Sequence, residues 1–166
     1  VQTWHNSCEY DEKVRRRRVG LRTTANRVCM RFLVVAQMDT PACVLIVEDD
    51  EFIASLIADA LREETNARPL VLHNGRDAIR FLAEQPIDLL ILDYQLPGAN
   101  GIEVYDTMRR NPRTAHTPVL FITANDKRTE FQRRGLTYIR KPFNLFELLT
   151  TVEQRLNTRQ SNAASI

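Results

Sequence analysis

The sequence predicts an α/β fold: a doubly wound, five-stranded parallel sheet with helices on both faces. Short apolar runs rich in Val, Ile and Leu recur between residues 43 and 139, as expected for strands that are buried on both sides. Most segments between them carry apolar residues at helical spacing, and the connections are short. Such an alternation gives parallel strands joined by right-handed crossovers. With 166 residues, 43% of them hydrophobic and 27% charged, the chain suits one well-cored domain with flanking segments.

The first two strands are expected at 44–47 (VLIV) and 70–72 (LVL). The helix between them carries one long apolar stripe, formed by Phe52, Ile53, Leu56, Ile57, Ala60 and Leu61. The segment 73–77 (HNGRD) opens the second helix, whose apolar residues are Ala78, Ile79 and Leu82. Asp50 and Glu51 suit the start of the first helix better than a metal site, because the helix dipole favours negative charge there.

The third, fourth and fifth strands are expected at 89–92 (LLIL), 119–122 (VLFI) and 137–139 (TYI). Asn100 is expected to cap the helix after the third strand, because Glu103 three residues later completes a capping box. The inner face of that helix is formed by Ile102, Tyr105 and Met108. The last helix, starting near Asn144, is expected to bury Leu145, Leu148, Leu149, Val152 and Leu156.

The excess of basic residues belongs to the N-terminal flank. Residues 1–40 contain eight Lys and Arg against four Asp and Glu, whereas the rest of the chain contains fifteen against seventeen. Because the run RRRR at 15–18 lies in polar sequence without a period, we expect a disordered extension, or a non-native one if translation starts at Met38. A basic arm can contact nucleic acid, but no aromatic interleaving supports this, and no nucleic-acid partner is expected. The domain is predicted at 41–157, with a polar tail at 158–166.

The cysteines and apolar runs indicate a cytoplasmic protein. The three cysteines, Cys8, Cys29 and Cys43, are odd in number and lack metal-like spacing, so free thiols in a reducing compartment are expected. The apolar run 32–36 is too short to span a bilayer, and no signal-peptide cleavage site follows it. No membrane association is therefore expected. The histidines His5, His73 and His116 show no ligand spacing and are expected at the surface.

Four of the five strands deliver polar residues to one edge of the sheet. Glu48 and Asp49 follow the first strand, Asp93 the third and Thr123 the fourth, while Lys141 comes after the fifth. The carboxyl ends of parallel strands meet at one edge, where α/β proteins gather their functional groups. Clustered carboxylates repel one another and favour a hard cation such as Mg²⁺, which is commonly held by one or two carboxylates and a phosphate. With an ammonium and a hydroxyl beside it, this pocket favours phosphoryl transfer to the Asp93 carboxylate.

Four segments, VLIVEDD, LLILDYQLPGANG, VLFITA and RKPF, resemble in order the signature segments of the receiver domain of two-component response regulators. Asp93 lies 44 residues after Asp49, and Thr123 lies 30 residues after Asp93, which are the usual family spacings. The resemblance covers residues 43–157 and implies a flavodoxin-like sheet of strand order 2-1-3-4-5. It implies that Asp93 is the phosphoacceptor, Thr123 the switch hydroxyl and Lys141 a contact of the phosphoryl group. The Mg²⁺ ligands it implies are Glu48, Asp49, Asp93 and the backbone carbonyl of Gln95.

The resemblance also implies roles beyond the transfer itself, and it has one departure. Tyr138 matches the aromatic residue that moves inward on activation, and Gln95 and Asn125 occupy positions that tune the lifetime of the phosphoryl group. Lys141 follows Thr123 by eighteen positions, about four fewer than is common in the family, which is roughly one helical turn. The fourth helix is therefore expected to be short, irregular or missing. This departure puts the family's usual dimer and output surface in doubt.

The expected function is that of a single-domain response regulator, because no output domain follows the receiver segment. A sensor histidine kinase is the expected phosphodonor, with a photoreceptor kinase as one candidate, and the output is contact with a downstream protein or a second copy of the chain. No enzyme activity is expected beyond Mg²⁺-dependent self-phosphorylation and slow autodephosphorylation. The alternatives are a phosphorelay intermediate or phosphate sink without its own output, and a constitutive binding module. A phosphatase is disfavoured, because Gln95 stands where such enzymes place a second acidic residue.

Overall fold

The structure is a computed structural model that describes residues 40–124 and 128–163. Its five strands are β1 (Ala42–Val47), β2 (Ala67–Leu72), β3 (Leu89–Asp93), β4 (Val119–Thr123) and β5 (Thr137–Arg140). Its helices are α1 (Glu51–Glu64), α2 (Gly75–Glu84), α3 (Gly101–Arg110), α4 (Arg128–Arg134) and α5 (Leu145–Ala163). All strand pairs are parallel and the order is β2-β1-β3-β4-β5, so the predicted fold is confirmed. Within these residues, none of the helices has both the length and the apolar character needed to cross a membrane.

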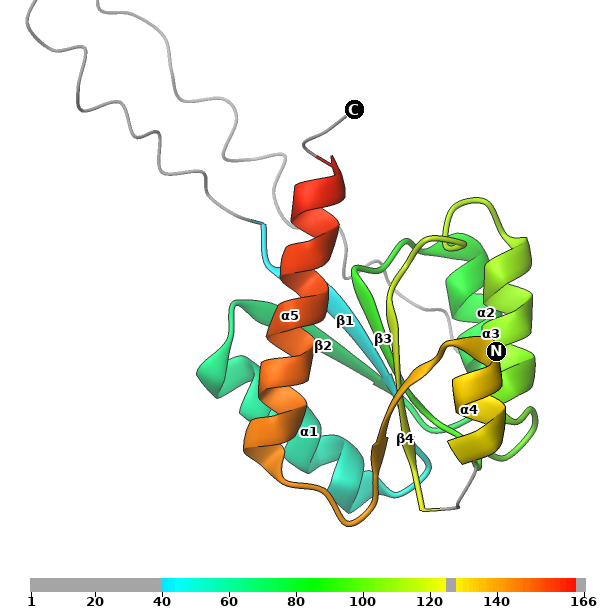
Figure 1. Cartoon of the computed structure of the whole chain (residues 1–166), viewed down its shortest axis with the longest axis horizontal. Coiled ribbons are helices and arrows are strands. Elements are labelled where there is room, and N and C mark those ends of the chain that lie inside the picture. The colour runs from blue at the N-terminus through cyan, green and yellow to red at the C-terminus, as the bar shows by residue number, and fades with distance from the viewer. Residues whose placement is uncertain (1–39, 125–127, 164–166) are drawn as a thin grey trace, which may run out of the picture. The chain divides into compact units, whose positions relative to one another are not determined.

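The sheet is covered on both faces. Helices α1 and α5 lie on one face, and α2, α3 and α4 lie on the other (Figure 1). Successive residues of a strand point to opposite faces. In β1, Val44 and Ile46 therefore pack toward α1 and α5, while Leu45 and Val47 join the core under α2 to α4. All four are fully buried, and burying an aliphatic side chain of this size contributes about 1.5–3 kcal/mol.

The predicted helix starts are confirmed by their caps. The Asp50 carboxylate accepts hydrogen bonds from the backbone N–H groups of Phe52 and Ile53, so it caps α1. Asn100 and Glu103 form the predicted capping box at the start of α3. These caps fix where the two helices leave the carboxyl-end edge of the sheet, directly beside the acidic residues.

The apolar stripe predicted for α1 is wrong at two positions. Phe52 is 79% exposed and Leu56 is 43% exposed. The buried face instead contains Ala54 and Ala58 together with Ile57. Small alanines let the helix lie close to the sheet, which turns the two larger side chains toward solvent.

Two element ends also differ from prediction. β2 begins at Ala67 rather than 70, although it contains Pro69. Because β2 lies at the edge of the sheet, a residue without an N–H donor is tolerated there. At the other end of the chain, α5 continues to Ala163, past residue 157, where we had placed the end of the domain. Residues 1–39, where we had expected an extension, lie outside the described residues.

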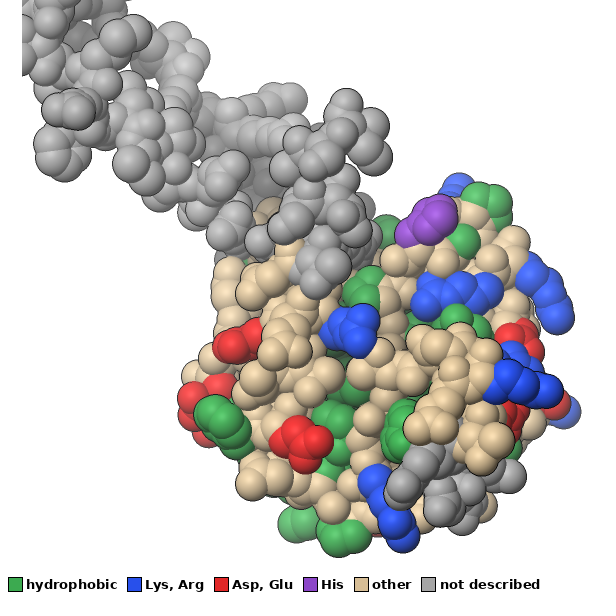
Figure 2. Space-filling model, viewed as in Figure 1, with side chains coloured by type: hydrophobic (Ala, Val, Ile, Leu, Met, Phe, Trp, Pro, Cys, Tyr) green, Lys and Arg blue, Asp and Glu red, His purple; other side chains and the backbone are tan. Residues whose placement is uncertain are grey.

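The fourth helix is short, as predicted. α4 has seven residues, and it packs on the sheet through Phe131, whose side chain is fully buried. Arg134 at its last turn pairs with Asp106 of α3 at 2.9 Å. In the space-filling view, most Lys and Arg side chains lie on the α3–α4 side, and several acidic ones lie on the α1–α5 side (Figure 2).

Candidate functional site

Two buried carboxylates lie next to each other at the carboxyl-end edge of the sheet. β1 and β3 are neighbours whose register pairs Val47 with Leu92, so the next residues, Glu48 and Asp93, stand at the same level. Glu48 is 2% exposed and Asp93 is 6% exposed. The topology of a parallel sheet therefore brings together two acids that are far apart in sequence.

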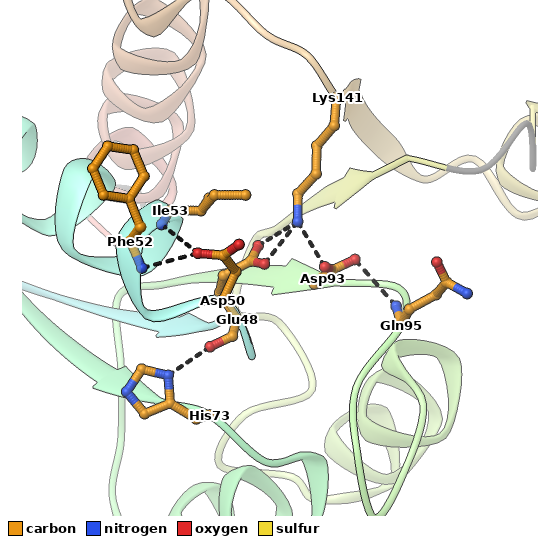
Figure 3. Close-up of polar contacts among 8 residues, drawn as sticks. All are labelled: Glu48, Asp50, Phe52, Ile53, His73, Asp93, Gln95 and Lys141. Carbon is orange, nitrogen blue, oxygen red and sulfur yellow. Dashed lines mark hydrogen bonds and ion pairs between the residues drawn. The ribbon is translucent and has the colours of Figure 1, made fainter.

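Lys141 connects these two acids. Its Nζ lies 2.7 Å from both carboxylate oxygens of Glu48 and 2.7 Å from Oδ2 of Asp93 (Figure 3). Lys141 directly follows β5, and its backbone N–H donates to the carbonyl of Thr123 at 2.8 Å. The ends of β4 and β5 are thus joined at the point where the ammonium group enters the pocket.

Burial and charge act on these groups in opposite directions. Burial raises the pKa of Glu48 from 4.5 to about 7, although the hydrogen bond from Lys141 works against this. For Lys141, burial alone would lower the pKa, but hydrogen bonds to Asp93 and Glu48 outweigh it and the pKa is raised. The ammonium therefore stays charged at neutral pH, whereas Glu48 is poised to exchange a proton.

The third acid completes a set that fits a divalent cation. Carboxylate oxygens of Glu48, Asp49 and Asp93 all lie within 4.8 Å of one another. The set contains three acidic groups for one ammonium, so positive charge is in deficit in the pocket. Asp49 is exposed, which leaves the set open to the water molecules that Mg²⁺ usually retains. Hard oxygen donors in this arrangement suit Mg²⁺, which would neutralise the excess negative charge of the pocket.

The loop after Asp93 is ordered by local hydrogen bonds. The backbone N–H of Gln95 donates to Oδ1 of Asp93 at 3.1 Å, and the N–H of Gly101 donates to the carbonyl of Tyr94 at 2.9 Å. Gln95 lies two residues beyond Asp93, with an exposed side chain at the rim of the pocket. Asn125, which we had predicted together with Gln95 to tune the lifetime of the phosphoryl group, lies outside the described residues.

Thr123 and Tyr138 lie on the same face of the sheet. The register pairs Phe121 with Tyr138, and Thr123 is two residues beyond Phe121, nearer the pocket. Thr123 is 1% exposed. The ring of Tyr138 packs on Phe131 with centroids 5.0 Å apart. The contact of Tyr138 with Phe131 therefore connects α4 to the face of the sheet on which Thr123 lies.

One residue of this region was missed from the sequence. His73 was expected only as a surface residue, and it is exposed, but its Nδ1 lies 2.7 Å from the backbone carbonyl of Glu48. No spacing could have indicated this, because the partner is a backbone atom. By contrast, Asp50 is a helix cap and not a member of the acidic set, as predicted.

Comparison with known proteins gives the family. Residues 44–153 match the response regulator receiver domain, so the chain belongs to the response regulator receiver family. It is 34% identical over 127 residues to the phosphate regulon transcriptional regulatory protein PhoB of Rhizobium meliloti, covering 74% of this chain and 55% of that protein. It is 28% identical over 161 residues to a probable cyclic di-GMP phosphodiesterase of Vibrio cholerae, covering 94% of this chain and 34% of that protein. The chain thus spans only part of these relatives.

Solved structures agree with this assignment. The chemotaxis response regulator CheY4 of Vibrio cholerae superposes with a TM-score of 0.65 at 27% identity, covering 70% of this chain and all of that one (100%). The receiver domain of the sensor histidine kinase PA1611 from Pseudomonas aeruginosa gives a TM-score of 0.64 at 25% identity, covering 70% of this chain and 98% of that one. That domain was crystallised with a magnesium ion coordinated in its active-site cleft.

Proposed function

We propose that the protein is a response regulator that accepts a phosphoryl group from a sensor histidine kinase on Asp93, with Mg²⁺, and signals by contact with another protein. The observation that carries the proposal is the bridge formed by Lys141 between Asp93 and the buried Glu48. A carboxylate held beside a fixed ammonium and two further acids is suited to a charged, metal-assisted transfer.

The proposed reaction moves a phosphoryl group from a histidine of the kinase to Asp93. A carboxylate oxygen of Asp93 attacks the phosphorus of a phosphohistidine, the new O–P bond forms and the N–P bond breaks, and the electron pair of that bond remains on the imidazole. The proposed protein ligands of Mg²⁺ are the carboxylates of Glu48, Asp49 and Asp93 and the backbone carbonyl of Gln95. Positioning and charge neutralisation do most of the work in such transfers, because the charge sits on the equatorial oxygens.

The proposed switch starts from the same lysine. Once Asp93 is phosphorylated, the phosphoryl group carries about −1.5 to −2 charges, and Lys141 and the Thr123 hydroxyl are the neighbouring donors. Drawing Thr123 toward the phosphoryl group changes the space beside Tyr138, which packs on α4 through Phe131. The output is then a rearranged α4–β5 surface, which biases binding of the partner protein.

The experiment is intact mass spectrometry after incubation with acetyl phosphate. We expect one phosphoryl adduct on the wild type with Mg²⁺, none with EDTA, and none on Asp93→Asn. Asp59→Asn, which removes an exposed carboxylate on α1, is the matched control and should form the adduct. Failure of the wild type to form any adduct would refute the proposal. A phosphorylated protein whose α4 and β5 amides exchange hydrogen unchanged would instead favour a relay or phosphate sink.

A further inference from the structure

The backbone of Glu48 is held at both polar atoms by the end of β2. Its N–H donates to the carbonyl of Leu72 at 3.0 Å, and its carbonyl lies 2.7 Å from Nδ1 of His73 (Figure 3). A carbonyl oxygen only accepts hydrogen bonds, so Nδ1 is the ring nitrogen that carries the hydrogen. His73 therefore donates to the peptide that joins Glu48 to Asp49.

This contact sets the direction of Asp49. The Glu48 carbonyl and the Asp49 nitrogen belong to one planar peptide unit, so a hydrogen bond to the carbonyl orients both. On the other side, Asp50 is fixed as the cap of α1. Asp49 itself is exposed, so packing does little to hold it. Its carboxylate is directed into the acidic set by a backbone that His73 and Asp50 hold on either side.

The start of α2, directly after His73 and Asn74, also holds the loop after Asp93. The N–H of Gly75 donates to the carbonyl of Pro97 at 3.0 Å, and Nε of Arg76 donates to the carbonyl of Gly98 at 3.1 Å. The approach is so close that a Cβ atom on Gly75 would lie 2.0 Å from the carbonyl oxygen of Ala99. Residues 73–76 therefore support both loops that carry the proposed Mg²⁺ ligands.

We infer that His73 is a positioning residue for the Mg²⁺ site, which holds the Glu48–Asp49 peptide in the orientation that binds the cation. This inference rests on the proposed function, since it assigns a support to the same site. It concerns a side chain that does not touch the cation or the reacting atoms. Partners of metal ligands commonly change metal affinity by 10–100-fold when removed, and a contact made through a backbone carbonyl should lie near the lower end.

The test compares two substitutions that differ in one hydrogen-bond donor. His73→Leu keeps an apolar side chain of moderate size and removes the donor, whereas His73→Asn places an amide N–H at the position of Nδ1. At pH 8, calorimetric titration should show Mg²⁺ binding weakened about five- to ten-fold in His73→Leu and within about two-fold of wild type in His73→Asn. His116→Leu, an exposed histidine at the opposite edge of the sheet, is the control and should bind like wild type.

A second readout needs no metal. In metal-free protein, the backbone amide of Glu48, which donates to the carbonyl of Leu72, should exchange hydrogen faster in His73→Leu than in wild type, and His73→Asn should restore the wild-type rate. Unchanged Mg²⁺ affinity in His73→Leu, or equal weakening in His73→Asn, would overturn the inference. If the phosphoryl adduct on Asp93 still forms in that case, the proposed function stands. If the wild type neither binds Mg²⁺ nor forms the adduct, the proposed function fails and the inference fails with it.

Discussion

Replacing Phe131 by alanine should release α4 from the rest of the molecule. The ring is fully buried and contacts Phe121 and Tyr138 at centroid distances of 5.0 Å and Tyr94 at 6.0 Å. Truncating a buried Phe to Ala costs about 3–5 kcal/mol when the cavity stays open. The chain can avoid part of this cost by letting α4 unfold, because an isolated helix of seven residues is unstable in water.

Among the described side chains, the other tie between α4 and a neighbouring helix is an ion pair. The ion pair of Arg134 with Asp106 is about one-third exposed on both sides, and pairs of this kind contribute about 0–1 kcal/mol. We therefore expect Phe131→Ala to lower the free energy of unfolding by about 3 kcal/mol. Hydrogen exchange in 128–136 should rise to that of an unfolded segment, while β1 and β3 stay protected.

Urea denaturation followed by circular dichroism measures the first effect, and hydrogen exchange by mass spectrometry measures the second. Phe131→Leu, which keeps most of the volume, is the control and should cost about 1 kcal/mol with α4 still protected. A loss below about 1 kcal/mol in Phe131→Ala, with exchange of α4 unchanged, would show that Phe131 is not its anchor.

Three further results are expected. Gly101→Ala should slow adduct formation about ten-fold or more, because its Cβ would lie 2.4 Å from the backbone oxygen of Asp93, the proposed phosphoacceptor. Gly135→Ala, with φ of +62° and open space, should cost about 1 kcal/mol and leave the adduct rate unchanged. Because burial raises the pKa of Glu48 to about 7, protons compete with Mg²⁺ below that pH. The Mg²⁺ affinity measured by calorimetry should therefore strengthen as the pH rises from 6 to 8, and Glu48→Gln should lose most of this pH dependence. Asn100→Ala removes a capping box and should lower the urea-derived unfolding free energy by about 1 kcal/mol; no change would mean that solvent replaces the cap.

Much of the fold could be predicted because its signals are local. The runs VLIV and VLFI are apolar and β-branched, which marks strands covered on both faces, and they lie in β1 and β4. Asn100 and Glu103 mark a helix start by chemistry that acts within one turn. The meeting of Glu48 with Asp93 followed from a rule of topology, since parallel strands present their carboxyl ends at one edge.

The errors have a different origin. Helical spacing in α1 gives a wide apolar arc, but only tertiary packing decides which part of the arc faces the sheet. In the structure, the small Ala54 and Ala58 are buried, whereas Phe52 and Leu56 are exposed. The contact of His73 with Glu48 was invisible for another reason. It joins residues 25 positions apart through a backbone carbonyl, which every residue has, so no residue type at the partner position could indicate it.

In the proposed switch, Lys141 connects the pocket at Asp93 to the ends of β4 and β5. Its ammonium bonds to Glu48 and Asp93 at equal distances of 2.7 Å, so any new charge at Asp93 must redistribute these contacts. The backbone N–H of Lys141 donates to the carbonyl of Thr123. The residue whose ammonium contacts Asp93 is therefore bonded through its backbone to the residue that carries the hydroxyl. Thr123 in turn lies on the face of the sheet where Tyr138 meets Phe131. In the proposed function, a single phosphoryl group acts on α4 through neighbouring residues of β4 and β5, and a seven-residue helix with one buried ring is an element that such a small displacement can move.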